Sequence, residues 1–312
     1  MTHKSKLPLI VIVGPTAAGK TAVSIDLAQR FDGEIVSADS CLLYRGMDIG
    51  TAKPTKDERL CVPHHLIDVA APDESWSLGI YQREAYHAID AIHRRAKLPF
   101  LVGGTGQYIR SIIEGWQIPS QEPDLDLRNA LISWSEDIGA EGLHERLSRL
   151  DPEAANRIEP RNLRRTVRAF EVIIKKGKRF SELRSKQICR YRVKIMGVQR
   201  SREDLFGRVD QRIEQMLDGG LVDEVRGLLN SGYSPKLSSM SAIGYREIIQ
   251  YLQGEITYDE AVILLKRNTR ILVRRQANWF KPDDPYITWF LANEQIVDEM
   301  EVLIRRWLGE IK

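Results

Sequence analysis

The residues with the clearest chemical potential lie near the start of the chain, in the run Gly14-Pro15-Thr16-Ala17-Ala18-Gly19-Lys20-Thr21. This run satisfies the phosphate-loop pattern of Gly, four residues, Gly, Lys and Ser or Thr. The glycines of such a loop allow a turn that aims backbone N–H groups inward, and Lys20 adds a mobile positive charge. Thr21 would be the hydroxyl ligand of a magnesium ion that the same phosphates hold. The loop therefore predicts a bound diphosphate or triphosphate.

The residues around the loop bear on what happens to that anion. The pattern is typical of nucleotide-binding and ATP-binding proteins, which normally carry a further acidic residue at the end of an apolar strand to organise metal and water. Here the apolar run Pro99–Val102 ends instead in Gly103-Gly104-Thr105-Gly106, with a hydroxyl and backbone donors in place of a carboxylate. This composition favours an anion that departs as a leaving group, although a nucleotide remains open as the ligand.

The carboxylate best placed near the loop is that of Asp39, directly after the apolar run Glu34–Ala38. Ligands of open parallel sheets bind beyond the carboxyl ends of the strands, so we expect Asp39 to face the same crevice as Lys20. Asp39 would act there as a base or a metal partner, and the alternative is an ordinary turn former. Asp48 is a second candidate of lower rank, because it lies in an expected loop.

The elements that must position these residues alternate between apolar runs and amphipathic stretches, which is typical of a parallel sheet with crossover helices. We expect an α/β core over residues 1–119 and 190–312, interrupted by a helical insertion over 120–189. The expected strands are Leu9–Val13, Glu34–Ala38, Pro99–Val102 and Tyr191–Val198. The expected helices of the core are Lys20–Arg30, Leu78–Ala96, Arg202–Asn230, Ala242–Tyr251 and Tyr258–Trp279. His64-His65 is expected in a turn, and the tail after Pro285 is expected to pack on the core.

Composition excludes several classes of protein. The 312 residues are 43% hydrophobic and 29% charged, which are ordinary globular values. The longest apolar stretch, Leu7–Val13, is far shorter than the roughly 20 residues that span a bilayer. Three cysteines, Cys41, Cys61 and Cys189, have spacings unlike a disulfide framework or a zinc site. We therefore expect a cytoplasmic monomer without membrane contact.

Positive charge is concentrated in the expected insertion. Residues 161–194 hold 13 basic side chains and two acidic ones, and Arg161, Arg164, Arg165 and Arg168 follow a helical spacing. A second set, Arg267, Arg270 and Arg274, lies in residues 261–282, which contain no acidic residue. Two such surfaces favour a bulky nucleic acid over a free nucleotide, with strongly salt-dependent binding. Tyr245 and Trp279 are candidates to stack on bases, with a place in the core as the alternative.

Together these strings resemble the tRNA dimethylallyltransferase family, which prenylates adenosine 37 beside the anticodon. The matching segments are Gly14–Thr21, Ser37–Ser40, Tyr44–Pro54, His64–Asp68, Val102–Gly106 with Tyr108-Ile109, Asp151–Glu171, Gly244–Arg246 and Thr269–Phe280. They follow the family order through nearly all of the first 280 residues. The resemblance implies a P-loop NTPase-like core with a tRNA-binding insertion, dimethylallyl diphosphate as donor and Mg²⁺ as cofactor.

The resemblance also implies roles for single residues. The diphosphate would lie on the loop amides, Lys20, Thr21 and magnesium, with Thr105 across the crevice. Arg208, and also Arg212, would add positive charge as the allylic bond breaks, and Asp39 would accept a proton from N6 of adenine. The tRNA contacts of the family map onto Asp39, Ser40, Cys41, Leu42, Thr105, Arg128, Arg164, Arg165, Thr166, Val167, Arg168, Ser241, Ala242, Ile243, Gly244, Tyr245 and Arg246. Leu42 stands where many members carry Gln.

Three other classes keep part of this pattern. A nucleoside or nucleotide kinase would bind ATP on the same loop but would have no use for the basic insertion. A non-catalytic RNA-binding protein would bind RNA equally well after Asp39→Asn. A prenyltransferase acting on free nucleotides would keep the loop and lack the insertion.

Overall fold

The structure is a computed structural model that describes residues 6–118, 124–182 and 189–310. The chain divides into two compact units, one formed by Met1–Ile113 with Cys189–Lys312 and the other by Glu114–Ile188. The second unit therefore begins at Glu114, earlier than the expected boundary at residue 120. The first unit is called the core unit below, and the second is called the insertion unit.

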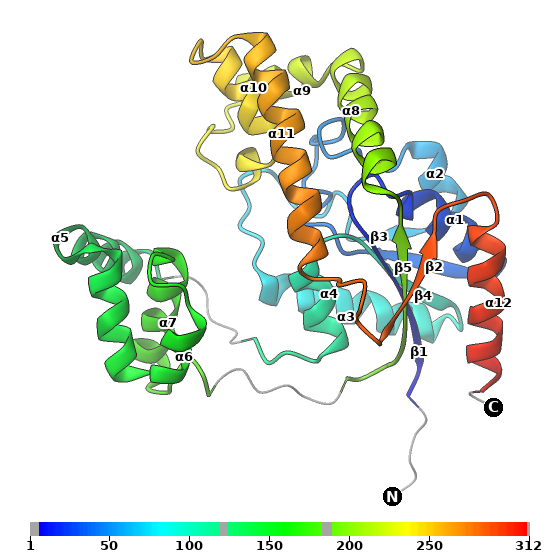
Figure 1. Cartoon of the computed structure of the whole chain (residues 1–312), viewed down its shortest axis with the longest axis horizontal. Coiled ribbons are helices and arrows are strands. Elements are labelled where there is room, and N and C mark those ends of the chain that lie inside the picture. The colour runs from blue at the N-terminus through cyan, green and yellow to red at the C-terminus, as the bar shows by residue number, and fades with distance from the viewer. Residues whose placement is uncertain (1–5, 119–123, 183–188, 311–312) are drawn as a thin grey trace, which may run out of the picture. The chain divides into compact units, whose positions relative to one another are not determined.

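The described part of the core unit contains one parallel sheet of six strands in the order β3-β2-β4-β1-β5-β6 (Figure 1). Five of the six residues of β1, Leu9 to Val13, are fully buried, as expected of a central strand covered on both faces. The α/β fold class predicted from the alternating pattern is confirmed. The strands are β1 Pro8–Val13, β2 Gly33–Ser37, β3 His64–His65, β4 Leu98–Val102, β5 Arg192–Gln199 and β6 Ile287–Leu291.

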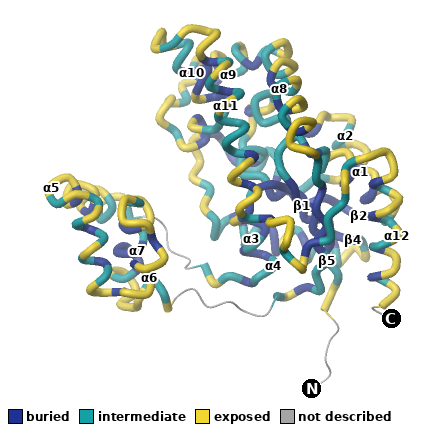
Figure 2. The backbone as a smooth tube through the Cα atoms, in the orientation of Figure 1, coloured by how far each residue is buried: buried dark blue, intermediate teal, exposed yellow. Residues whose placement is uncertain are grey.

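Helices cover both faces of the sheet. On one face, α1 (Lys20–Arg30) and α12 (Ile296–Gly309) pack over Ile10 and Ile12 of β1. On the other face, α3 (Leu78–Arg94) and α4 (Gly106–Ile113) pack over Leu9, Val11 and Val13. Successive side chains of a strand point to opposite faces, so β1 contributes to both cores. Figure 2 shows β1 as a buried strand inside the core unit.

The remaining helices of the core unit are α2 (Lys56–Cys61), α8 (Arg202–Asp218), α9 (Leu221–Asn230), α10 (Tyr245–Leu252) and α11 (Tyr258–Ala277). The single helix predicted over Arg202–Asn230 is wrong, since it breaks at Gly219-Gly220, where Gly220 takes a φ of 94° that favours glycine. The predicted turn at His64-His65 is also wrong. These residues form β3, which pairs with Ile35 and Val36 at the edge of the sheet.

The C-terminal tail completes the core unit, as predicted. Strand β6 pairs with β5, and α12 packs against α1. Trp307 is buried in the same core as Ile10, and Phe290 packs against it. The tail is therefore part of the sheet and of its helical cover.

The insertion unit is helical in its described residues. Its helices are α5 (Leu125–Leu150), which bends at Gly139 with a φ of 76°, α6 (Pro152–Arg157) and α7 (Leu163–Lys176). Leu131, Leu143, Val167 and Phe170 form part of a small core of its own. Within the described residues of both units, every helix is too short or too polar to span a membrane.

Candidate active site

The loop between β1 and α1 takes its form from close contacts with neighbouring strands. Gly14 has a φ of 148°, and a Cβ there would lie 2.4 Å from the carbonyl oxygen of Val198 in β5. Gly19 has a φ of 104° at the N-terminus of α1. Both positions therefore require glycine, one for close packing and both for conformation. The loop begins after β1 and ends at α1, as the phosphate-loop pattern predicts.

Three charged side chains interact electrostatically beside this loop. Burial lowers the pKa of Lys20 to about 8; the carboxylate of Asp39 opposes this shift, and the guanidinium of Arg212 adds to it. Burial also lowers the pKa of Arg212, and the same carboxylate opposes that shift. The Nζ of Lys20 donates to the carbonyl oxygen of Pro15 at 2.8 Å. The predicted neighbourhood of Lys20 and Asp39 is thus present, with Arg212 beside them.

Asp39 lies directly beyond β2, and its turn is tied to the end of β4. Its Oδ1 accepts from the N–H of Cys41 at 2.9 Å, so it is also the turn former that the sequence left open. The Oγ1 of Thr105 accepts from the N–H of Ser40 at 3.1 Å, and the N–H of Thr105 donates to Ala38 at 3.1 Å. Thr105 therefore holds the turn that carries Asp39.

Arginines from β5 and α8 hold the loops around the site. The Nε of Arg208 donates to the carbonyl oxygen of Ala17 at 3.2 Å, and the Nε of Arg200 donates to that of Ala18 at 2.9 Å. Arg212 donates to the carbonyl oxygen of Ala52 at 3.4 Å. Arg208 was a candidate from the sequence. Arg200 was not, because nothing near it in the sequence indicates that the end of β5 reaches the loop.

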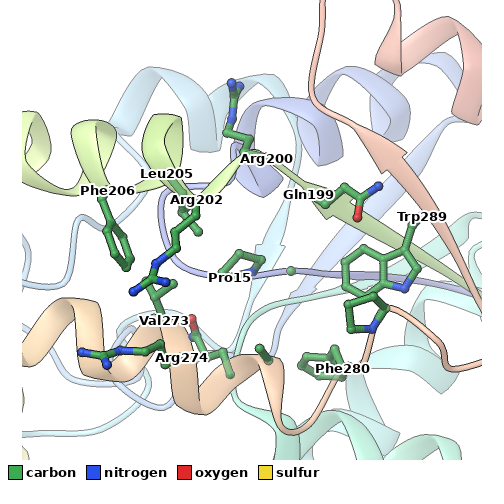
Figure 3. A pocket seen from close by; sticks show the side chains of 14 residues that line it. Pro15, Gln199, Arg200, Arg202, Leu205, Phe206, Val273, Arg274, Phe280 and Trp289 are labelled. Carbon is green, nitrogen blue, oxygen red and sulfur yellow. The ribbon is translucent and has the colours of Figure 1, made fainter.

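A cavity of about 250 Å³ opens beside the loop (Figure 3). Pro15 of the loop, Leu205 and Phe206 of α8, and Trp289 of β6 are among its apolar walls, and Arg200, Arg202 and Arg274 are its basic ones. An apolar cavity rimmed by positive charge suits a ligand that has both a hydrocarbon and an anionic part.

Gln276 of α11 is a further site residue that the sequence analysis missed. Its Oε1 accepts from the N–H of Thr16 in the loop at 2.8 Å, and its Nε2 donates to the carbonyl oxygen of Gly104 at 3.4 Å. The residue is only 7% exposed. Its separation of 260 residues from Thr16 explains why sequence reasoning could not find the contact.

The residues near the loop fit a magnesium ion of the kind that phosphates carry. Among the described residues, no group of three or more His, Cys, Asp and Glu side chains could form a metal cage. The exposed Thr21 at the start of α1 could supply one hydroxyl oxygen, and Asp39 one carboxylate. Mg²⁺ is typically bound by one or two protein oxygens together with phosphates and water.

Asp48, the lower-ranked candidate base, is committed elsewhere. Its carboxylate pairs with Lys53, whose Nζ also contacts Asp68 at 2.5 Å. The backbone N–H groups of Asp48, Ile49 and Gly50 all donate to the carboxylate of Glu224 at 2.8–3.1 Å. Asp48 is therefore part of a structural ion-pair cluster, and Asp39 is the carboxylate that lies at the loop.

The core-unit candidates for RNA contact divide by exposure. Ser241 and Arg246 are exposed, whereas Gly244 and Tyr245 are buried. The hydroxyl of Tyr245 donates to Glu224 at 2.6 Å inside the core. We therefore correct the expectation that Tyr245 could stack on a base, because its ring has no exposed face. Trp279 is half-buried and packs against Gly106, where a Cβ would lie 2.1 Å from its ring.

The second basic set of the core unit is also partly committed. Arg270 pairs with Asp210, and its guanidinium lies 5.5 Å from the ring centre of Phe206. Arg267 and Arg274 are exposed. The expected basic face of α11 is therefore made by these two residues and excludes Arg270.

In the insertion unit, Arg164 and Arg165 are exposed on α7, while Thr166 and Val167 are buried. The side chains of Thr166 and Val167 thus belong to the core of the unit and not to its surface. Arg161 is not on the predicted helical stripe, because α7 begins at Leu163. Arg161 instead pairs with Glu141 at 2.8 Å.

Two further candidates share one buried carboxylate. Arg128 donates to Glu171 at 3.0 and 3.2 Å, and Arg168 donates to the same oxygen at 2.7 Å. Glu171 also accepts from the N–H of Asp124 at 2.8 Å and is fully buried. Hydrogen bonds from both arginines keep the pKa of Glu171 below its usual value, against the effect of burial.

The fold and the site define an α/β protein with a P-loop NTPase-like core and a helical insertion. The family model described as IPP transferase matches residues 42–283, and the one described as isopentenyl transferase matches residues 7–74. The chain belongs to the IPP transferase family and is a transferase.

Individual relatives extend along the whole chain. A tRNA dimethylallyltransferase from Roseiflexus sp. (strain RS-1) is 48% identical over 97% of this chain and 99% of its own length. The full-length tRNA isopentenylpyrophosphate transferase from Bacillus halodurans is 40% identical, with a TM-score of 0.74 and 98% of each chain covered. A structure described as a eukaryotic dimethylallyltransferase acting on tRNA is 26% identical, with a TM-score of 0.81, over 96% of this chain and 77% of that one.

Proposed function

We propose that the protein transfers the dimethylallyl group of dimethylallyl diphosphate to N6 of adenosine 37 in tRNA and releases diphosphate. One observation carries the proposal: Asp39, directly after β2, lies close enough to Lys20 and Arg212 to interact with their charges, so that a phosphate-binding loop has a carboxylate beside it. The family and its relatives, several of them named tRNA dimethylallyltransferases, support the donor and the acceptor.

The donor is held by its diphosphate. The first amides of α1 have no partner within the helix, and Lys20 and Arg212 add positive charge next to them. Arg208 is fixed at Ala17 within the loop and can contact the oxygen that leaves. Charge held in place before the reaction stabilises the diphosphate as its negative charge grows.

The reaction is a substitution at the allylic carbon. The bond from that carbon to the diphosphate oxygen breaks, and both electrons leave with the diphosphate. The lone pair of N6 forms the new bond, and the proton of N6 passes to the carboxylate of Asp39. The lone pair of an aromatic amine is delocalised, so both orientation and a base are needed. The hydrogen bond from Cys41 leaves one oxygen of Asp39 oriented for this task.

Magnesium is proposed as the cofactor, with Thr21 and the diphosphate oxygens as ligands. When bound, it would neutralise part of the charge of the leaving diphosphate. Thr105 keeps the Asp39 turn in place from the end of β4.

The RNA contacts follow from exposed positive charge. Arg164 and Arg165 on the insertion unit, and Arg267 on the core unit, are exposed and can contact phosphates. Arg246 is also exposed, but its guanidinium donates to the buried Glu247 at 2.7 and 3.2 Å. Adenosine 37 must leave its stack to reach the donor, at a cost of a few kcal/mol that such contacts can offset. We further propose a cytoplasmic monomer, because one chain carries the loop, the carboxylate and the basic insertion, and tRNA is available there.

The test is incubation of the protein with Mg²⁺, dimethylallyl diphosphate, ATP and an anticodon stem-loop that has adenosines at nucleotides 36 to 38. The RNA should gain the mass of one dimethylallyl group, and replacing the middle adenosine should abolish the gain. A kinase would leave the RNA unchanged and consume ATP, and a binding protein would retain the RNA unmodified. Either result would rule the proposal out.

A further inference from the structure

The mechanism proposed above gives no role to the contact between Gln276 and the phosphate-binding loop. The carboxamide of Gln276 comes from the last turn of α11 and bridges two loops, since it accepts from Thr16 and donates to Gly104. A Cβ at Gly104 would lie 2.3 Å from Nε2 of Gln276, so a larger residue there would displace the carboxamide. With both polar atoms bonded and only 7% exposure, the side chain is firmly placed.

This bridge uses donors that a phosphate chain would otherwise occupy. The N–H of Thr16 bonds to Gln276, and the N–H of Ala18 bonds to the carbonyl oxygen of Pro15 at 3.3 Å. On the strand side of the loop, the N–H of Thr16 is thus paired within the protein. The amides at the start of α1, with Lys20, remain as the anion-binding end.

The consequence concerns how many phosphates the loop can hold. If the amides of α1 and Lys20 hold two phosphates, a third one can be added toward the strand side of the loop. A third phosphate would therefore meet the Thr16 amide already bonded and the carboxamide in its place. Two phosphates need neither the amide nor that space.

We propose that Gln276 is a specificity-determining residue that limits the loop to diphosphates and excludes triphosphates. The inference rests on the proposed function, since it concerns the donor of the same site. Gln276 would distinguish this loop from the phosphate-binding loops of ATP-dependent enzymes that share its sequence pattern. The expectation of ATP binding that attaches to the loop pattern then fails for this chain.

The test compares inorganic pyrophosphate with inorganic tripolyphosphate, both with excess Mg²⁺, by titration calorimetry on the full chain. Charge alone favours tripolyphosphate, so the inference predicts the opposite order. The wild type should bind pyrophosphate at least about tenfold more tightly, which is 1.4 kcal/mol. Equal or tighter binding of tripolyphosphate by the wild type would overturn the inference without any variant.

Two variants distinguish the hydrogen bond from the bulk of the side chain. Gln276→Ala frees both the Thr16 amide and the space that the side chain fills. The ratio of the Kd for tripolyphosphate to the Kd for pyrophosphate should therefore fall at least about fivefold. Gln276→Leu frees the amide but keeps the bulk of the side chain, so the same ratio should fall less than in Gln276→Ala. Gln250→Ala on α10 is the matched control and should leave the ratio unchanged. If the role of Gln276 were purely structural, the substitutions would weaken the binding of both ligands by the same factor. That result would also contradict the inference.

The dimethylallyl transfer assay on the wild type keeps the two hypotheses apart. A wild type that prefers pyrophosphate but does not modify RNA contradicts the proposed function and supports the inference. A wild type that modifies RNA but binds tripolyphosphate as tightly as pyrophosphate does the reverse.

Discussion

The arginines of the core unit and those of the insertion unit are held in different ways. In the core unit, Arg200, Arg208 and Arg212 each donate to a backbone carbonyl oxygen of the loops around the site. In the insertion unit, Arg164 and Arg165 project from α7 and are exposed. Charge that is fixed by the backbone can stabilise one developing charge at one point. Exposed charge attracts a polyanion without such fixed geometry.

Under the proposed function, the fixed arginines of the core unit act on the donor and the exposed arginines of α7 bind RNA. Changes at the core site should affect the chemical step, whereas changes on α7 should affect RNA affinity and its dependence on salt. Arg128 and Arg168 are intermediate, because they belong to the insertion unit but are fixed by the buried Glu171.

The largest effect is expected at Asp39. Asp39→Asn removes the proton acceptor while its side chain can still accept from Cys41, so the rate at saturating substrates should fall about 10³-fold. Single-turnover transfer to RNA measures this rate, and RNA affinity should stay within about twofold. The matched control is Asp48→Asn, which changes a carboxylate paired with Lys53. A rate above a tenth of the wild-type value in Asp39→Asn would exclude this carboxylate as the base.

A double substitution on α7 tests the other side of the comparison. Arg164→Ala with Arg165→Ala should raise the KM for RNA about tenfold at physiological salt and leave the single-turnover rate unchanged. The slope of log affinity against log salt should fall by about two, one for each lost phosphate contact.

The control for the α7 double variant removes the same amount of charge. Arg149→Ala with Arg157→Ala changes two exposed arginines that pair with Glu145 and Glu153 on their own helices. These should lower RNA affinity less than twofold. If both double variants weaken binding equally, the insertion acts through its net charge and not through α7.

The pH dependence of donor binding tests the lowered pKa of Lys20. Since burial lowers its pKa to about 8, the side chain is charged below that pH and neutral above it in the free enzyme. The KM for dimethylallyl diphosphate should therefore be constant below about pH 7, roughly double between pH 7 and pH 8 and rise about fivefold between pH 8 and pH 9. Lys20→Arg keeps its charge and should give a flat profile. A flat profile in the wild type would contradict the shifted pKa.

The smallest effect on turnover is expected at Glu171. Glu171→Gln leaves two guanidiniums around a neutral group, which should destabilise the insertion unit by about 3 kcal/mol. Hydrogen exchange in α5 and α7 should accelerate, RNA affinity should fall about threefold, and pyrophosphate affinity should not change. Glu145→Gln, at an exposed ion pair of α5, is the control. Unchanged exchange in Glu171→Gln would show that this carboxylate does not hold the two arginines.

The sequence predicted those features whose cause is local. The loop from Gly14 to Thr21 and helix α1 follow from glycine positions and apolar periodicity, and both are present. Asp39 could be placed near Lys20 because parallel strands present their carboxyl ends at one edge. The break between α8 and α9 was also local, and the pair Gly219-Gly220 could have indicated it.

The rest depends on contacts between distant segments. Gln276 meets Thr16, and Glu224 meets the backbone of residues 48–50, through packing that no local pattern encodes. Tertiary packing also buries Tyr245. The local sequence around an aromatic residue at the start of a helix is the same whether the ring faces the solvent or the core, so it could not predict this burial. Tertiary packing therefore decided which aromatic and charged candidates remained available.

The most direct measurement of the central claim is the stoichiometry of products in one reaction that contains dimethylallyl diphosphate, ATP, Mg²⁺ and the anticodon stem-loop. The account predicts one pyrophosphate released for each dimethylallyl group on the RNA, with no orthophosphate formed. Release of orthophosphate from ATP, with the RNA and the allylic donor both unchanged, would contradict it.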